Sequence, residues 1–147
     1  MKNKLKLVLW GKKLELPEDY DNLEFDNYEF SYSKCIPKQQ RLYLYKNNEM
    51  IKQIWYYDNG NKDIEYNYKN GKWNGKQCSW YSDRRLSYKW NYKNGKEDGK
   101  QYGWWGDGKL DYERNYKNGE QDGKQYWWSN NGKLKYEHNY KNGELIK

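Results

Sequence analysis

The tetrapeptide Tyr-Lys-Asn-Gly occurs four times in the chain, beginning at residues 68, 92, 116 and 140. Successive copies are 24 residues apart, and the residues between them also correspond. Self-similarity at a fixed period is typical of arrays in which each unit is one supersecondary element packed against its neighbours. This repeat constrains the fold more than any other feature of the sequence.

The repeated part of the chain divides into four and a half units. The earliest copy is degenerate and aligns with the others when one gap is placed just before Lys52. The units are 45–67, 68–91, 92–115, 116–139 and the half unit 140–147. Residues 1–44 do not repeat, and they include an acidic stretch, 15–29, without Lys or Arg. We interpret 1–44 as an N-terminal cap for the array, because solenoid ends need protection, with a short hairpin around Asp26 and Asn27. An acidic arm for a basic partner is the alternative.

Each unit is predicted to be a β-hairpin. In one unit a strand over 100–105 leads through the turn 106–108 into a strand over 109–116. Such a loop needs a left-handed last residue, which is Gly60, Gly108 or Gly132 in three units and Arg84 in the fourth. Asn-Gly, at 70–71, 94–95, 118–119 and 142–143, predicts a two-residue turn into the next hairpin. One extra residue must then bulge out, and we place it at Gly75, Gly99 and Gly123.

Simple alternation along these strands predicts two different faces. The monotonous face is expected to pair Trp80, Trp104 and Trp128 with Leu86, Leu110 and Leu134, with Tyr56 in the first unit, and to pair Ile54, Cys78, Tyr102 and Tyr126 with Ile64, Tyr88, Tyr112 and Tyr136. The varied face is expected to pair Gln53, Gln77, Gln101 and Gln125 with Glu65, Lys89, Glu113 and Glu137. A ligand or partner site should interrupt the repetition, so the varied face is the candidate surface.

Composition supports an all-β fold. The 147 residues suit one domain, and 18 Tyr and 9 Trp stand beside a single Val and neither Ala nor Thr. A helical bundle is excluded on this basis, since the usual helix-forming residues are scarce. We therefore expect an elongated single antiparallel sheet of tandem hairpins with an N-terminal cap.

Charge and cysteine content argue against nucleic acid as a partner and against a cysteine metal cluster. The net charge is +7, but basic and acidic residues alternate through the units, which disfavours nucleic acid as a partner. The sequence shows no signal peptide or transmembrane segment, so we expect an intracellular, cytoplasmic protein. Cys35 and Cys78 can form at most one disulfide and no metal cluster.

The spacing YxNGxxxGKQxxWWxxxGKLxYExN over about 45–147 resembles the MORN repeat, and more closely its variant form found in tandem in a bacterial antitoxin family. The resemblance implies stacked β-hairpins in one sheet. It also implies a role in protein scaffolding, attachment to phospholipid membranes or neutralisation of a toxin, and such repeats are common in large viruses of amoebae. The chain departs from the standard pattern at Lys100-Gln101 and at Glu113-Arg114, where glycines are usual.

Catalysis is not expected from these residues. His138 is the only histidine and varies with Tyr66, Trp90 and Arg114 in its column. Glu113 and Glu137 lie one unit apart, which at about 10 Å is too far for a retaining carboxylate pair, and pairing with Gln and Lys explains them better. Asp98 and Asp122 precede glycines and indicate turns. We predict no enzyme, no cofactor and no metal site.

The candidate partner-binding residues are aromatic and cationic side chains of the varied face, a combination enriched at protein interfaces. They are Trp55, Tyr57, Tyr81, Arg85, Trp105, Lys109, Trp127 and Lys133. The leading interpretation is a protein-binding scaffold, a homo-oligomer or an antitoxin-like protein. An anionic membrane surface comes second, and a small quaternary ammonium or glycan ligand third.

Overall fold

The computed structural model describes residues 8–9, 12–13, 28–35, 39–46 and 49–146, with side chains from 41 onwards. The expected hairpin around Asp26 and the acidic stretch lie almost wholly outside these residues. The described part is all β and contains no helix long and apolar enough to cross a bilayer.

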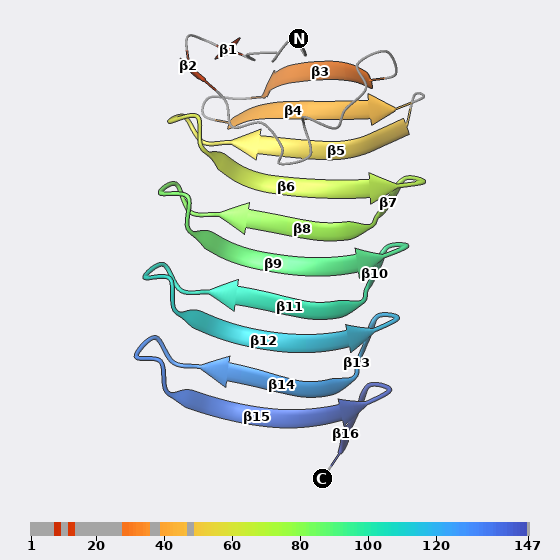
Figure 1. The fold of residues 1–147 in the computed structure, drawn as a ribbon, viewed down its shortest axis with the longest axis vertical. Helices are drawn as coiled ribbons and strands as arrows, with labels where there is room; N and C mark the ends of the chain where they lie inside the picture. Colours follow the sequence, from red (N-terminus) through yellow and green to blue (C-terminus); the bar gives the residue numbers. More distant parts are fainter. Residues whose placement is uncertain (1–7, 10–11, 14–27, 36–38, 47–48, 147) are drawn as a thin grey trace, which may run out of the picture.

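Fourteen of the described strands join in one open antiparallel sheet, and β1 (Val8–Leu9) pairs separately with β2 (Lys12–Lys13). The strands follow one another in chain order along the long axis of the molecule (Figure 1). The sheet contains β3 (Tyr28–Cys35), β4 (Gln39–Lys46), β5 (Glu49–Tyr56), β6 (Lys62–Lys69), β7 (Lys72–Trp73), β8 (Gly75–Trp80), β9 (Leu86–Lys93), β10 (Lys96–Glu97), β11 (Gly99–Trp104), β12 (Leu110–Lys117), β13 (Glu120–Gln121), β14 (Gly123–Trp128), β15 (Leu134–Lys141) and β16 (Glu144–Ile146). The predicted all-β fold of tandem hairpins is confirmed. The boundary placed between the cap and the repeats falls within β4, which pairs with both β3 and β5.

Both kinds of turn form as their residues predict. In the three-residue loop 106–108, the Trp105 amide donates to the Lys109 carbonyl at 2.8 Å, and Gly108 has a φ of 88°. Arg84, the exception in sequence, adopts the same left-handed conformation with a φ of 74°. The Asn-Gly pairs have positive φ at both residues, as the mirror-image two-residue turn requires.

The bulge expected at Gly75, Gly99 and Gly123 contains more residues than predicted. The Asn74 amide donates to the Asn67 carbonyl, and the next paired residues are Glu65 and Cys78. Tyr66 alone therefore lies opposite the three residues 75–77, so two residues are extra and not one. Gly75 has a φ of 84°, which a side chain would disfavour.

A glutamine side chain closes the gap that this bulge leaves between units. Strands β9 and β11 pair directly only at Tyr102 with Lys89 and at Gly103 with Tyr88. Beyond them the side-chain amide of Gln101 bridges to the Asn91 backbone. Gln101 Oε1 accepts from the Asn91 N–H at 2.7 Å, and Gln101 Nε2 donates to the Asn91 carbonyl at 2.8 Å. The Gln101 side chain thus replaces a peptide group in the ladder.

The other seams repeat this arrangement. Gln77 bridges the backbone of Asn67, and Gln125 bridges that of Asn115. All three bridging glutamines are at most 1% exposed. The predicted pairing of these glutamines with Glu and Lys side chains is therefore wrong, because their amides are used by backbone groups.

A second bulge, inside each hairpin, changes the predicted faces. Trp104 lies opposite Leu110 as expected, but Gly103 lies opposite Tyr112, so Asp111 is an extra residue. The same shift occurs in the other units. Consequently Tyr102 pairs with Glu113 and not with Tyr112, and Gln101 pairs with Arg114 and not with Glu113. The two columns on the second strand of each hairpin have exchanged faces relative to the prediction.

The sheet therefore has two faces that we name by their regular members. The leucine face carries Leu86, Leu110 and Leu134 with Trp80, Trp104 and Trp128, together with the column Glu65, Lys89, Glu113 and Glu137. The glutamine face carries Gln77, Gln101 and Gln125 with the columns Ile64, Tyr88, Tyr112, Tyr136 and Tyr66, Trp90, Arg114, His138.

The densest packing lies on the leucine face of the first strands. Leu42, Leu44, Ile54 and Tyr56 are at most 1% exposed and form one cluster. Towards the other end of the array the equivalent surface opens, and Leu134 is 49% exposed. Within the later units Trp104 stacks on Tyr102, and Trp128 stacks on Tyr126, both with ring centroids 5.6 Å apart. These contacts give Trp104 and Trp128 a packing role on the leucine face.

Candidate interaction surface

Aromatic and cationic side chains form a connected band across the glutamine face. We call it the aromatic band. Its members come from most of the strands between β5 and β15, and nearly all are half-buried. They are Trp55, Tyr66, Trp73, Tyr88, Trp90, Tyr92, Tyr112, Arg114, Trp127 and His138.

The band begins with rings contributed by the first two units. Trp55 packs edge-on against Tyr66 at 6.2 Å, and Tyr66 stacks on Trp73 at 5.1 Å. The guanidinium carbon of Arg41 lies 4.2 Å from the centre of the Trp55 ring. Trp73 then meets Tyr92 of the next unit edge-on at 5.0 Å. These contacts cross from one unit to the next and so help to hold the stack together.

The band continues through the middle of the sheet by a hydrogen bond. Tyr88 stacks on Trp90 at 4.4 Å, and the Trp90 indole N–H donates to the Tyr112 hydroxyl at 2.8 Å. The Tyr112 ring can lie flat over its neighbour because that neighbour is glycine. A Cβ on Gly103 would stand 2.2 Å from the ring. Burial raises the pKa of Tyr88 well above its ordinary value, and its hydrogen bond with Tyr66 adds to the shift.

Arg114 joins this middle part to the last full unit. Its guanidinium carbon lies 4.5 Å from the centre of the Tyr112 ring and 5.4 Å from that of Trp127. Trp127 in turn meets His138 edge-on at 5.8 Å. The only histidine of the chain is therefore an exposed member of an aromatic cluster.

Two of the predicted partner-binding residues instead join neighbouring units near the three-residue loops. The Tyr57 hydroxyl donates to the Trp80 carbonyl at 2.7 Å, and the Tyr81 hydroxyl donates to the Trp104 carbonyl at 2.8 Å. Burial, followed by the nearby Asp63 carboxylate, raises the pKa of Tyr57 to about 12. Trp105 occupies the same position one unit later. Its indole nitrogen is buried and has no hydrogen-bond partner.

The three predicted cations lie in or beside the same loops and are exposed. Arg85 pairs with Asp83 at 2.5 Å, and Lys109 pairs with Asp107 at 2.8 Å. The Lys109 ammonium also donates to the Asn130 carbonyl of the next loop at 2.9 Å. The Lys133 amide donates to Asn131 Oδ1. The structure thus brings Trp55 and Trp127 into the aromatic band and places the other six predicted residues at the loop edge.

Sequence reasoning missed most of the band. Tyr66, Trp90 and Arg114 share a column with His138, which suggested only a variable surface position. The bulge inside each hairpin places this column on the glutamine face. The bulged residue differs in type from unit to unit, so the sequence does not mark it; it is Asp63, Ser87, Asp111 or Lys135. The sequence did contain one indication of the band: aromatic and cationic residues replace one another in that column.

The carboxylates do not form an acid–base pair. Glu113 binds Lys100 at 2.6 Å, and Glu137 binds Lys124 at 2.7 Å, each within its own hairpin. The predicted Lys–Glu pairing is therefore confirmed at these positions. Within the described residues, no group of three or more His, Cys, Asp and Glu side chains is placed to hold a metal ion.

Comparison with known families identifies the repeat. No curated protein matches the chain. The family model of the MORN repeat variant matches residues 51–70, 97–118 and 121–142. The interval between the first two matches contains most of the unit 68–91, in which Cys78 and Arg84 depart from the other units. MORN repeats generally bind proteins or membranes and are a non-enzymatic repeat type. Three of the repeats in this chain therefore match the MORN repeat variant.

Proposed function

We propose that this protein is a non-enzymatic binding scaffold that holds a protein partner, or a second copy of itself, against the aromatic band. The observation that carries the proposal is the band itself. Large rings and one guanidinium lie in contact across successive units, and they remain only half-buried. Tyr, Trp and Arg are the residues that contribute most to protein interfaces.

The single-layer architecture leaves this surface accessible. From β6 to β15 no other described element lies over the sheet in Figure 1. Contacts such as Trp90 with Tyr112 and Arg114 with Trp127 fix the rings before any partner arrives. A preorganised surface loses little side-chain entropy on binding, which favours affinity.

Charge favours a protein over a membrane as the partner. Ion pairs such as Lys100 with Glu113 and Lys124 with Glu137 offset part of the net positive charge locally. A surface that binds anionic lipid gains about 1 kcal/mol for each nearby Lys or Arg and loses it as salt rises. Attachment to phospholipid remains the alternative that the following experiment separates from a protein partner. A toxin to be neutralised would be one kind of protein partner.

The test compares two surface variants with the wild type. Arg114→Ala combined with Trp127→Ala removes the contact that joins the middle of the band to the last full unit, whereas Trp128→Ala removes a neighbouring tryptophan from the leucine face. Sedimentation velocity measures self-association, and crosslinking with mass spectrometry in lysate of the source cells identifies other partners. Loss of one defined complex in the band variant, with retention in Trp128→Ala, supports the proposal. Salt-sensitive binding to phosphatidylserine vesicles, equal in all three proteins and without a protein complex, contradicts it.

A further inference from the structure

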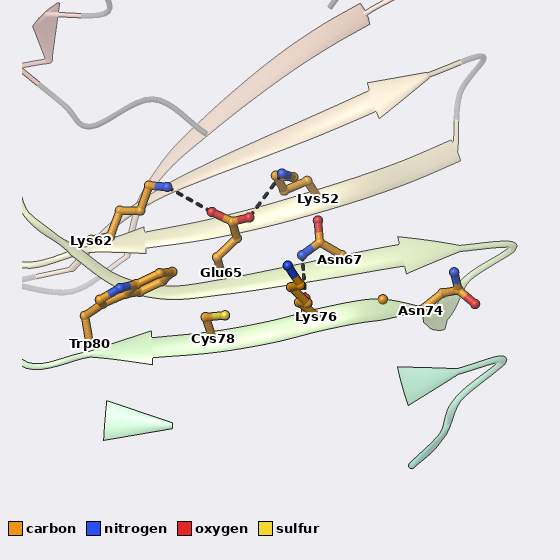
Figure 2. A pocket seen from close by; sticks show the side chains of 9 residues that line it. Lys52, Lys62, Glu65, Asn67, Asn74, Lys76, Cys78 and Trp80 are labelled. Carbon is orange, nitrogen blue, oxygen red and sulfur yellow. Dashed lines mark hydrogen bonds and ion pairs between the residues drawn. The ribbon is translucent and has the colours of Figure 1, made fainter. Parts of the chain in front are cut away.

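A cavity on the leucine face lies where the repeat is broken. It has a volume of about 360 Å³ and is formed by β5, β6, β8 and the residues before β8. Its lining includes Lys52, Lys62, Glu65, Lys76, Cys78 and Trp80 (Figure 2). This is the opposite face from the aromatic band, so its function is separate from the proposed scaffold role.

The first irregularity is a missing ring. In the next two units a tyrosine stands two residues before the regular tryptophan and stacks on it, as Tyr102 does on Trp104. In the second unit that position is Cys78, so Trp80 lacks the corresponding tyrosine. Cys78 is a free thiol between Trp80 and Lys76 along β8 (Figure 2). The cavity therefore contains an aromatic stacking slot that the later units fill with their own side chains.

The second irregularity is a change from leucine to lysine. Lys62 occupies the column of Leu86, Leu110 and Leu134, opposite Tyr56. Its side chain is only 9% exposed, and its ammonium lies 5.4 Å from the centre of the Trp80 ring. It binds Glu65 Oε2 at 3.0 Å, while Lys52 binds Glu65 Oε1 at 3.1 Å. A buried cation thus lies beside the open slot.

The third irregularity concerns the charge beside Cys78. Lys100 and Lys124 each have a glutamate on the paired strand, whereas Lys76 has Lys89 in the corresponding position. Glu65 is already shared by Lys52 and Lys62. Burial alone would raise the pKa of Glu65, but these two ammonium groups lower it below its ordinary value. Lysines therefore outnumber carboxylates around the slot.

From these three departures we infer that the cavity binds a flat aromatic ring carrying a carboxylate or phosphate. The ring stacks on Trp80 above Cys78, in the place that tyrosine takes in other units. The anionic group lies towards Lys62 and Lys76. Stacking and charge act on one ligand, so neither a neutral ring nor a simple anion satisfies the site.

The chain itself supplies the variants that test this assignment. Cys78→Tyr restores the residue type of the next two units, and Lys62→Leu restores that of the leucine column. Both changes place a side chain where the same fold already carries it, so folding should be retained and is checked by circular dichroism. Lys76→Met removes the cation beside the slot, and Lys100→Met is its matched control one unit later.

Binding is measured by isothermal titration calorimetry and by quenching of tryptophan fluorescence. The probes are phenyl phosphate, 4-hydroxyphenylacetate, inorganic phosphate and benzyl alcohol. The first two should bind to the wild type, and Cys78→Tyr should weaken them by about tenfold or more, as expected for loss of one stacking contact. Lys62→Leu and Lys76→Met should also weaken them, whereas Lys100→Met should not.

The source of the ligand is distinguished by a peptide. Gly-Gly-Gly-Phe with a free carboxylate binding more tightly than 4-hydroxyphenylacetate would indicate the end of a protein chain, and the reverse order a small molecule. Either order supports the inference if Cys78→Tyr weakens the binding of both probes by about tenfold or more. Absence of binding by any aromatic anion overturns it. So does equal binding of inorganic phosphate, or binding that is unchanged in Cys78→Tyr.

Discussion

The first and last units share one 24-residue pattern, yet the same columns are buried in one and exposed in the other. Lys62 of the first unit is 8% exposed, whereas Leu134, in the same column of the last unit, is 49% exposed. Ile64 is half-buried, whereas Tyr136 in its column is 59% exposed. The local turns and register are nevertheless alike at both ends. Burial in this molecule is therefore determined by neighbouring strands and not by the unit itself.

This difference shows how stability is distributed along the array. A unit in a solenoid contributes its own folding energy and an interface energy with each neighbour. The first strands add a buried cluster and two lysines sharing one glutamate, whereas the last unit has mainly hairpin contacts. We expect the array to unfold from its last unit, where local opening requires the least free energy.

The largest contrast should come from the same truncation at the two ends. Leu42→Ala is expected to lower the free energy of unfolding by about 3 to 5 kcal/mol, because it leaves a cavity in the buried cluster. Leu134→Ala should cost less than about 1 kcal/mol, since the side chain is already half exposed. Urea denaturation followed by tryptophan fluorescence measures both values. Equal losses would contradict the uneven distribution of stability.

The shared glutamate should make the first unit sensitive to acid. Glu65→Gln leaves two buried ammonium groups without their carboxylate and is expected to cost about 3 kcal/mol at neutral pH. The pKa of Glu65 is lowered in the folded protein. Its contribution is therefore complete above the unfolded pKa, near 4.5, and is lost as the pH falls through the folded pKa.

Comparison with the last hairpin provides the control for this pH dependence. Glu137→Gln disrupts an exposed ion pair with Lys124 and should change stability by about 1 kcal/mol or less. Thermal unfolding of both variants and the wild type between pH 3 and 7, a range chosen about the ordinary glutamate pKa, measures the difference. A Glu65→Gln deficit that persists unchanged at the acid end would disprove the assigned charge state.

Loss of one glutamine bridge should have an intermediate effect. Gln101→Ala leaves the Asn91 N–H and carbonyl without their partner in a buried seam, at a cost of about 2 kcal/mol. In Gln53→Ala the lost contact is with the Tyr68 hydroxyl, at 3.2 Å, so the cost should be smaller. Hydrogen exchange of the Asn91 amide reports the seam directly. Unchanged protection in Gln101→Ala would show that the bridge contributes nothing.

The smallest effect is expected at a loop. Arg84 holds a left-handed conformation that glycine adopts in the other three loops, so Arg84→Gly should stabilise the protein by about 0.5 to 1 kcal/mol. The gain is limited because Arg84 Nε donates to Asn61 Oδ1 at 3.0 Å. The reverse change, Gly108→Arg, should destabilise by a similar amount in thermal unfolding. A loss of stability in Arg84→Gly would mean that the Asn61 contact outweighs the backbone strain.

Much of this fold could be predicted from local residue chemistry. The Asn-Gly pairs and the glycines that end the three-residue loops each specify a tight turn within a few residues. The hairpins and the order of the strands could therefore be predicted from them. The bulge at Asp111 and its equivalents could not be located, because the residues there share no side-chain type. The bridging role of Gln101 was equally hidden, since it depends on how far two strands separate.

The candidate sites were less predictable, for a related reason. Trp55 and Trp127 were correctly assigned to the varied face, but Trp90 and Arg114 required the true register. The cavity had a signal in the sequence, because Cys78 and Lys62 each break a column. These two departures could be linked only once the structure showed that Lys62 and Cys78 lie on the same face of adjoining strands.

The glutamine bridge has a consequence for how such a protein grows. Every full unit carries both halves of the seam, a Gln such as Gln101 near its start and an Asn such as Asn115 at its end. A duplicated 24-residue segment therefore joins the unit before it and the unit after it without any compensating mutation. Length can change by whole units in a single genetic event, while each new junction is hydrogen-bonded from the outset.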